Sequence, residues 1–209
     1  MSSHGLENTS FIHVGLLCSV CGLGLAALLV LAVVLNYNGL VRARNSIRES
    51  WACIDTELKR RYDLIPNLVE TVKGYAVHER QVLEEVVAAR TRAVASTGSP
   101  NSQAADENML VQALRQIFAL AEAYPQLKAD ANFRKLQDEL VNTEDRIQAA
   151  RRFYNANVRD YNNRVQAFPS NIIAGLFSFR AAEYFEVEEV GIRQAVQVGF
   201  DGGAPKPTA

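Results

Sequence analysis

A long apolar run opens the chain, between residues 12 and 35. The segment "IHVGLLCSVCGLGLAALLVLAVVL" carries no charged side chain apart from His13 near its edge. As a helix of 24 residues it would extend roughly 36 Å, enough to cross a hydrocarbon core of about 30 Å. It lacks the basic start and the small-residue cleavage pattern of a signal peptide. The pattern therefore predicts an uncleaved transmembrane anchor at 12–35, preceded by a short tail at 1–11.

Beyond residue 36, apolar side chains recur at intervals of three, four or seven residues, the spacing of one buried helix face. Four such runs can be followed. Their members are Leu40, Ile47, Trp51, Ile54, Leu58 and Ile65; Leu68, Val72, Tyr75, Val82, Val86 and Ala93; Leu110, Leu114, Ile117 and Leu120 or Ala121; and Phe133, Leu136, Leu140, Thr143, Ile147, Ala150, Tyr154, Val158, Tyr161, Val165 and Phe168. Four long runs with short connections predict an all-α fold, an antiparallel up-and-down four-helix bundle over residues 36–190, with a flexible tail at 191–209.

The connection between the first two runs lies near Asp63 and Pro66. Asp63 suits the N-cap of a new helix with Pro66 in its first turn, so the chain is expected to turn or kink here. The apolar phase continues through the proline, as it would in a single bent helix. Gly74 is expected in mid-helix, where it would allow a neighbouring helix to approach closely.

Three further features of the bundle can be predicted. Trp51 is expected to be buried in the seam of the first helix. The stretch "STGSPNSQ" at 96–103 predicts a loop, because these residues do not sustain a helix. The third run should end before Tyr124-Pro125, since the residue before a proline is pushed out of the helical region.

The segment "FPSNIIAGLFSFRAAEYF" at 168–185 has two interpretations. Pro169 should end the fourth helix, and the apolar side chains that follow are too few to span a bilayer. In one interpretation, residues 169–190 fold back and cover the base of the bundle. In the other, they lie on the bilayer surface or dock a second copy. The preceding Tyr-Asn pairs, at Tyr37, Tyr154 and Tyr161, suggest a polar-aromatic layer, with Tyr37 and Tyr161 at the same level near the membrane.

Charge bears on partners and on orientation. The chain has 22 basic and 23 acidic residues, so it has no overall positive field for nucleic acid, and we expect no nucleic-acid partner. Arg42, Arg44 and Arg48 follow the apolar run, whereas no Lys or Arg precedes it. The positive-inside rule then predicts a single-pass protein of the cell (inner) membrane, with its short N-terminus outside and its helical domain in the cytoplasm.

The side chains that could take part in catalysis or metal binding do not form a recognisable site in the sequence. His78-Glu79 resembles the start of H-E-x-x-H, but Val82 stands where the second His is needed. Asp63, Glu70 and Glu79 have the pattern of solvated acids on helices. Cys18 and Cys21 lie within the apolar run and should behave as small apolar residues, while Cys53 is alone in the soluble part. The sequence therefore predicts no catalytic residue, no cofactor and no metal site, and a protein that is not an enzyme.

Long blocks of the chain are similar to the LemA family of bacterial membrane proteins. These blocks are "YNGLVRARNSIRESWACIDTELKRRYDLIPNLVETVKGYAVHE" at 37–79, "LEEVVAARTRA" behind it, and "TEDRIQAARRFYNANVRDYNNRVQAFPSNIIAGLFSFRAAEYFEVEE" at 143–189. The resemblance implies an N-terminal anchor, an up-and-down helical bundle and no assigned catalytic residue. It also implies a protein partner, with membrane metalloproteases of the heat-shock type as the family-level association.

Two functions remain open after this comparison. The first is a non-enzymatic, membrane-anchored scaffold or adaptor that recruits a protein partner. The second is a structural protein that forms homo-oligomers on the membrane surface. A third, a di-iron enzyme built on the bundle, lacks the Glu-x-x-His pairs that such sites need.

Overall fold

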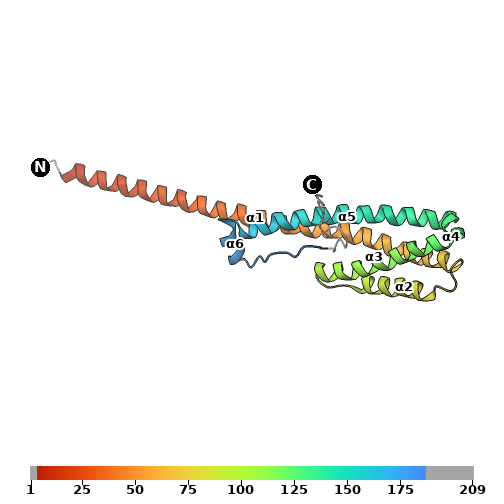
Figure 1. Ribbon diagram of the computed structural model, residues 1–209. Coiled ribbons are helices and arrows are strands. Elements are labelled where there is room, and N and C mark those ends of the chain that lie inside the picture. Colours follow the sequence, from red (N-terminus) through yellow and green to blue (C-terminus); the bar gives the residue numbers. More distant parts are fainter. Residues whose placement is uncertain (1–3, 187–209) are drawn as a thin grey trace, which may run out of the picture.

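The protein is an elongated assembly of helices (Figure 1). The computed structural model describes the backbone of residues 4–186 and the side chains of residues 22–186. Its helices are α1 (His4–Lys73), α2 (Arg80–Ala95), α3 (Pro100–Ala123), α4 (Pro125–Ala129), α5 (Ala131–Gln166) and α6 (Ser170–Leu176). Residues 4–186 contain no strand, so the predicted all-α fold is confirmed. The tail predicted at 191–209 lies outside the described residues.

Helix α1 is the axis of the molecule. It is a single helix of 70 residues whose N-terminal part projects from the bundle (Figure 1). From Gly22 onward it includes an 18-residue window with a mean hydropathy of 2.0, and only 6% of that window is buried. Helix α1 is therefore long and apolar enough to cross a membrane. We call the end of the bundle from which α1 projects the near end, and the opposite end the far end.

The two halves of the bundle are built differently. Helices α1 and α5 run antiparallel along its whole length, whereas the shorter α2–α3 hairpin covers only the far half (Figure 1). There, four helices bury most of the predicted seam positions, although Leu68 and Val72 belong to α1 rather than to a second helix. The seam assignments of Tyr75 and Phe168 are wrong, since these side chains are exposed. In the near half, residues 170–186 take the place beside α1 and α5 that the hairpin leaves free. The predicted four-helix bundle is thus found in the far half, and two helices with a C-terminal segment form the near half.

Of the two alternatives at Pro66, a boundary between two helices is wrong and a single helix is the one found, because α1 continues through the proline to Lys73. An interior proline leaves the carbonyl four residues earlier without its N–H partner, at a cost of ~3 kcal/mol. In this protein that carbonyl belongs to Tyr62, and the side chain of Arg90 in α2 donates a hydrogen bond to it at 2.8 Å. Ile65, Leu68 and Val72 are fully buried on the continuing helix. Burial of three such side chains, each about 1.5–3 kcal/mol, outweighs the cost of the proline.

The chain reverses instead at residues 74–79, between α1 and α2. The prediction that Gly74 lies in mid-helix is therefore wrong, since it follows the last residue of α1. Two contacts tie this turn to the opposite side of the far end. The Tyr75 hydroxyl donates to Asp130 at 3.0 Å, and the Tyr124 hydroxyl donates to Glu79 at 3.3 Å. Asp130 also accepts from the Phe133 N–H as the N-cap of α5, and this bond, followed by that of Tyr75, lowers its pKa.

Two other predicted boundaries can be compared with the structure. Helix α3 ends at Ala123, which confirms the stop before Tyr124-Pro125. The loop predicted at 96–103 is shorter, because Ser99 caps α3 and Pro100 occupies its first turn, where a missing N–H costs nothing. Trp51 is half-buried rather than buried. Its ring meets those of Tyr154 and Phe185 edge-on, with centroids 5.3 and 5.4 Å away.

We expect Arg90→Met to destabilise the protein by about 1–3 kcal/mol, because it leaves the Tyr62 carbonyl without a partner. Pro66→Ala restores the missing N–H, so the double variant should be clearly less destabilised than the sum of the two single changes. Chemical denaturation of all four proteins gives this coupling free energy. Strict additivity would show that Arg90 does not compensate for the proline.

Candidate functional site: a buried ion-pair network and a C-terminal strap

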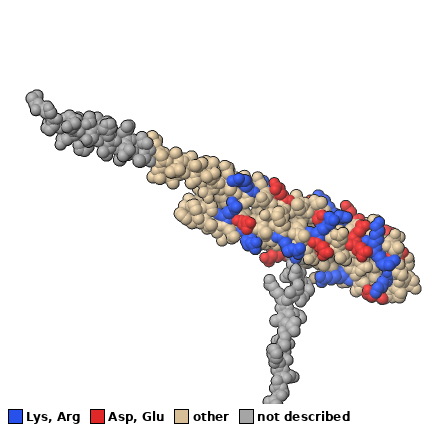
Figure 2. Space-filling model, turned by 90° about the horizontal axis from the view of Figure 1, so that it is seen from above, with Lys and Arg blue, Asp and Glu red and all other residues tan. Residues whose placement is uncertain are grey.

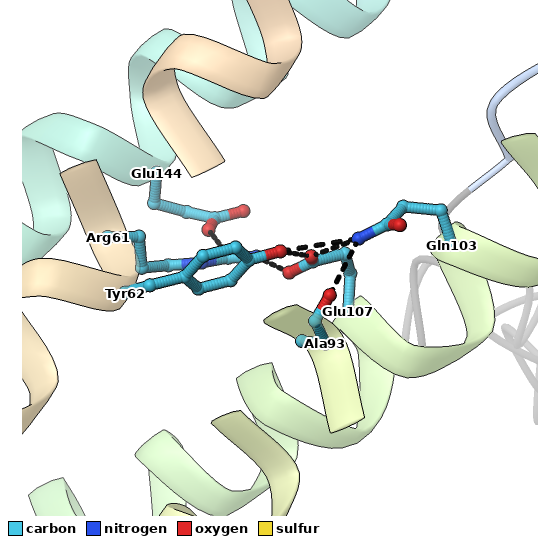
Figure 3. Close-up of polar contacts among 6 residues, drawn as sticks. All are labelled: Arg61, Tyr62, Ala93, Gln103, Glu107 and Glu144. Atoms are coloured by element: carbon cyan, nitrogen blue, oxygen red, sulfur yellow. Dashed lines mark hydrogen bonds and ion pairs between the residues drawn. The ribbon is translucent and has the colours of Figure 1, made fainter. Parts of the chain in front are cut away.

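A cluster of polar side chains lies inside the bundle, midway along it (Figure 3). Arg61 and Tyr62 come from α1, one turn after the buried Leu58. Gln103 and Glu107 come from α3, where their spacing of four residues places them on its buried face. Glu144 is on α5. Arg61 and Glu107 are each only 2% exposed, so both are nearly completely removed from water.

Glu107 receives most of the hydrogen bonds in this network. It pairs with the Arg61 guanidinium and accepts the Tyr62 hydroxyl proton in a second hydrogen bond. Gln103 Nε2 donates to the same carboxylate at 2.9 Å, and lies 3.2 Å from the carbonyl of Ala93 at the end of α2. The second terminal nitrogen of Arg61 donates to Glu144 at 2.7 Å. The network therefore connects α1, α2, α3 and α5.

The surroundings of Tyr62 keep its hydroxyl protonated. Burial, followed by the charge of Glu107, raises the pKa of Tyr62, so its hydroxyl stays protonated and remains a donor. The Arg61 Nε atom is buried without a hydrogen-bond partner. Only a cavity of about 10 Å³ lies beside the pair, bordered by Phe185 among others. That is room for roughly one water molecule and not for a substrate.

The arrangement is suited to specifying structure. A buried ion pair contributes little net stability, but separating its members costs several kcal/mol, so helix pairings that leave Arg61 or Glu107 alone are disfavoured. The one partly exposed carboxylate of the cluster is that of Glu144, and it is paired with Arg61. Among side chains 22–186, there is no group of three or more His, Cys, Asp or Glu that could hold a metal ion.

The structure separates the acids and the histidine that were considered as candidates. Asp63, Glu70 and His78 are exposed, and Glu79 bonds Tyr124 in the far turn. Glu144, which the sequence analysis did not single out, pairs with Arg61. Sequence reasoning missed the network, although it had a signal. Gln103 and Glu107 lie at the same helical spacing as the apolar residues of α3 that follow them. Two polar residues therefore occupy positions where the pattern expects apolar ones.

Residues 177–186, which we call the C-terminal strap, form a second unusual feature. Residues 177 and 178 form a turn after α6, and residues 179–186 then run along α1 and α5 in the near half without regular secondary structure. Two Tyr-Asn pairs of α5, seven residues apart, hold them. The Tyr154 hydroxyl donates to the Glu183 carbonyl at 3.0 Å, and that of Tyr161 to the Arg180 carbonyl at 2.9 Å. Burial raises the pKa of both tyrosines, which therefore stay donors.

The two asparagines hold the strap in the way that a neighbouring β-strand would. Asn162 donates to the Ala182 carbonyl at 3.0 Å and accepts from the Ala182 N–H at 2.8 Å. Asn155 makes the same pair of bonds with Phe185, at 3.1 and 2.9 Å. These contacts satisfy backbone groups of a segment that has no sheet beside it. They recognise a backbone conformation rather than particular side chains.

Two buried phenylalanines fix the ends of the strap. Phe179 lies against Tyr37 of α1, with ring centroids 5.7 Å apart, and under the guanidinium of Arg44. Phe185 is fully buried beside Trp51 and borders the cavity at the ion-pair network. Residues 179–186 thus fold back along the side of the near half rather than across its base, while Ile172 and Leu176 of α6 stay exposed, so each of the two sequence interpretations keeps a part of the segment. Residues 187–190 lie outside the described residues. Tyr37 and Tyr161 both contact the start of the strap.

Comparisons with known proteins place this architecture in a family. The family model described as the LemA family matches residues 50–200, a range that includes both the ion-pair network and the strap. The chain belongs to the LemA family. It is also similar to two curated proteins called magnetosome protein MamQ. One, from Paramagnetospirillum magneticum, is 25% identical over 187 residues, covering 78% of this chain and 69% of the relative. The other, from Magnetospirillum gryphiswaldense, is 23% identical, covering 85% and 74%.

A third relative carries the family's own name. Protein LemA from Metamycoplasma hominis is 23% identical over 154 residues, covering 73% of this chain and 70% of the relative. The relatives thus differ in their names and organisms while sharing most of their length with this LemA-family chain.

For the network, we expect Glu107→Leu to destabilise the protein by about 3–5 kcal/mol, because Arg61 loses its buried partner. Arg61→Met combined with Glu107→Leu should recover most of this loss, since no buried charge is then unpaired. Denaturant unfolding measures both. Arg80→Ala, which breaks the exposed pair with Glu84, is the control and should change the midpoint little. A double variant as unstable as the sum of its single changes would contradict the pairing.

For the strap, Asn162→Ala removes two hydrogen bonds to Ala182. We expect the strap to open more often and trypsin to cleave after the exposed Arg180 roughly tenfold faster or more. Asn163→Ala, at the exposed neighbouring position, is the matched control and should leave the rate unchanged. In Asn155→Ala, emission of Trp51, the single tryptophan of the chain, should shift to the red as Phe185 moves away. Equal rates of trypsin cleavage in Asn162→Ala and Asn163→Ala would rule out this role for Asn162.

Proposed function

We propose that this LemA-family protein is a non-enzymatic, membrane-anchored scaffold or adaptor. The observation that carries the proposal is the continuity of α1. One helix passes from the apolar stretch after Gly22 into the core of the bundle, without a loop between them. A helix of this kind holds the bundle at a fixed angle and height above the bilayer. That is useful for presenting a binding surface and is not needed for a freely tethered enzyme.

The chemistry of the interior supports a role without catalysis. Its most polar cluster is closed, and Glu107 is occupied by three donors. On the outside, acidic and basic side chains are interspersed over the bundle (Figure 2). Such a surface offers a protein partner complementary charges without a strong field of either sign.

The same reasoning gives a location and a partner class. Arg42, Arg44 and Arg48 favour a cytoplasmic bundle and an outside N-terminus on the inner membrane. A membrane protein, with a membrane metalloprotease as the candidate by family analogy, is the proposed partner. The relatives named magnetosome protein and LemA match 78% and 73% of this chain. Because their names differ, we take the scaffold itself, rather than binding to one particular partner, as the role that family members have in common.

Self-assembly on the membrane is the second candidate, and the strap favours it. Asn155 and Asn162 bind backbone atoms, so the strap of a neighbouring copy offers them the same groups as their own. Exchange of identical segments is a low-cost route to oligomers.

The test is purification of the full chain from native membranes in mild detergent after cross-linking, followed by mass spectrometry and sizing. The control is residues 1–36 fused to an unrelated helical protein, which keeps the anchor and removes the bundle. We expect a stoichiometric second protein that is absent from the control. A homogeneous particle of this chain alone would favour self-assembly, and a monomer without partner would contradict both functions.

A further inference from the structure

The near end of the bundle carries an exposed apolar stripe. Phe168 lies in the turn before α6, and Ile172 and Leu176 lie four residues apart on one face of that helix. They are 80%, 60% and 73% exposed, although large apolar side chains usually avoid water. The opposite face of α6 is used for packing, since Ile173 and Ala174 are buried against the bundle. Helix α6 therefore packs one apolar face against the bundle and leaves a second apolar face, with Ile172 and Leu176, open.

Helix α6 lies where α1 leaves the bundle (Figure 1). A pocket of about 200 Å³ marks this junction. It is lined by Leu35, Asn36, Gly39, Leu40, Arg164 and Ser170. Leu35 is the last residue of the predicted membrane span, and Leu40 is only about 8 Å further along a helix that rises ~1.5 Å per residue. If α1 crosses the bilayer as proposed, the pocket and α6 lie at the depth of the lipid headgroups.

Arginines that form no ion pair among side chains 22–186 lie at this junction. The Arg164 guanidinium reaches so close to α1 that a Cβ added at Gly39 would lie 3.4 Å from its Nη1 atom. Arg42 and Arg44 are nearby on α1, Arg44 lying over the Phe179 ring. The ion pairs formed by side chains 22–186 use cations further into the bundle, between Lys59 and Arg146, and include none of these three. A planar guanidinium presents paired donors that match a phosphate group.

We propose that the near end is a binding site for anionic phospholipid of the bilayer surface. The outer face of α6 is buried in the interfacial region of the bilayer, and Arg164 binds the phosphate of a lipid seated in the pocket between α1 and α5. Apolar side chains beside clustered arginines are the combination that peripheral helices use at anionic membranes. The bundle is thereby attached at two points, through α1 and through α6, and its tilt is fixed relative to the membrane.

Insertion of α6 can be measured with the full chain in nanodiscs that hold one copy each. Incorporation into the discs tests the anchor of the proposed function separately from this inference. In a Trp51→Phe background, Leu176→Trp places the single indole on the stripe. We expect strong quenching by phospholipids with brominated acyl chains. Val141→Trp, at an exposed position of α5 in the far half, is the control and should show none. An unquenched indole at position 176 would overturn the inference.

Headgroup binding is tested in discs of phosphatidylcholine and phosphatidylglycerol. Native mass spectrometry of the released chain should find phosphatidylglycerol retained, and Arg164→Gln should lower this retention roughly fivefold, as expected for one arginine at an anionic surface. Arg134→Gln, an exposed arginine at the far end of the same helix, should have no effect. Equal losses in both variants, or displacement of the lipid by excess inorganic phosphate, would overturn the assignment of a lipid site.

Discussion

The charges of Arg61 and Glu107 must find their partners inside the protein, because both side chains are almost completely shielded from water. Uncompensated, either charge would cost several kcal/mol, which is a large part of the stability of a domain this size. The bundle satisfies them by bringing α3 and α5 to one level of α1, where Glu107 and Glu144 meet the same guanidinium. That level is also where the α2–α3 hairpin ends and the strap arrives, through Gln103 on one side and Phe185 on the other. A slip of α1 or α3 by one turn would break the pair, and a slip of α5 would take Glu144 away from Arg61, so the network fixes the register of these three helices at this level.

The near half solves a different problem with a different device. Helices α1 and α5 are longer than the hairpin that covers them, and two helices alone cannot enclose an apolar seam. The strap supplies the missing layer as a segment without regular secondary structure, and the backbone of such a segment needs hydrogen-bond partners from elsewhere. Asn155 and Asn162 provide them from the helix surface, while Phe179 and Phe185 fill the seam. The near half therefore has a closed apolar seam of its own, along which α1 continues without a break toward the apolar stretch near Gly22.

Periodicity alone predicted the seams well, because Ile54, Leu58, Leu68 and Val72 had to face a common core whatever their partners were. At Pro66 the apolar phase continued correctly, and the proline with the N-cap signal of Asp63 was what misled; the compensation for the proline comes from Arg90 on another helix, 28 residues from the carbonyl that it bonds. The sequence around Pro66 contains no pattern that predicts a hydrogen-bond partner on another helix. Arg61 and Glu107, 46 residues apart, were missed for the same reason. The strap was hardest to foresee in detail, since a segment recognised through its backbone carries no side-chain signature of its partner. The equal spacing of two Tyr-Asn pairs was visible, but not what they bind.

The central claim is that the bundle is a rigid continuation of the membrane helix. Hydrogen–deuterium exchange of the full chain in nanodiscs tests it most directly, because amide protection reports whether a helix opens locally. We predict slow exchange without interruption from residue 36 to residue 72, past both the bilayer surface and Pro66. A rapidly exchanging segment between residues 36 and 47 would reveal a hinge at the membrane, and the account of a fixed, anchored scaffold would then be wrong.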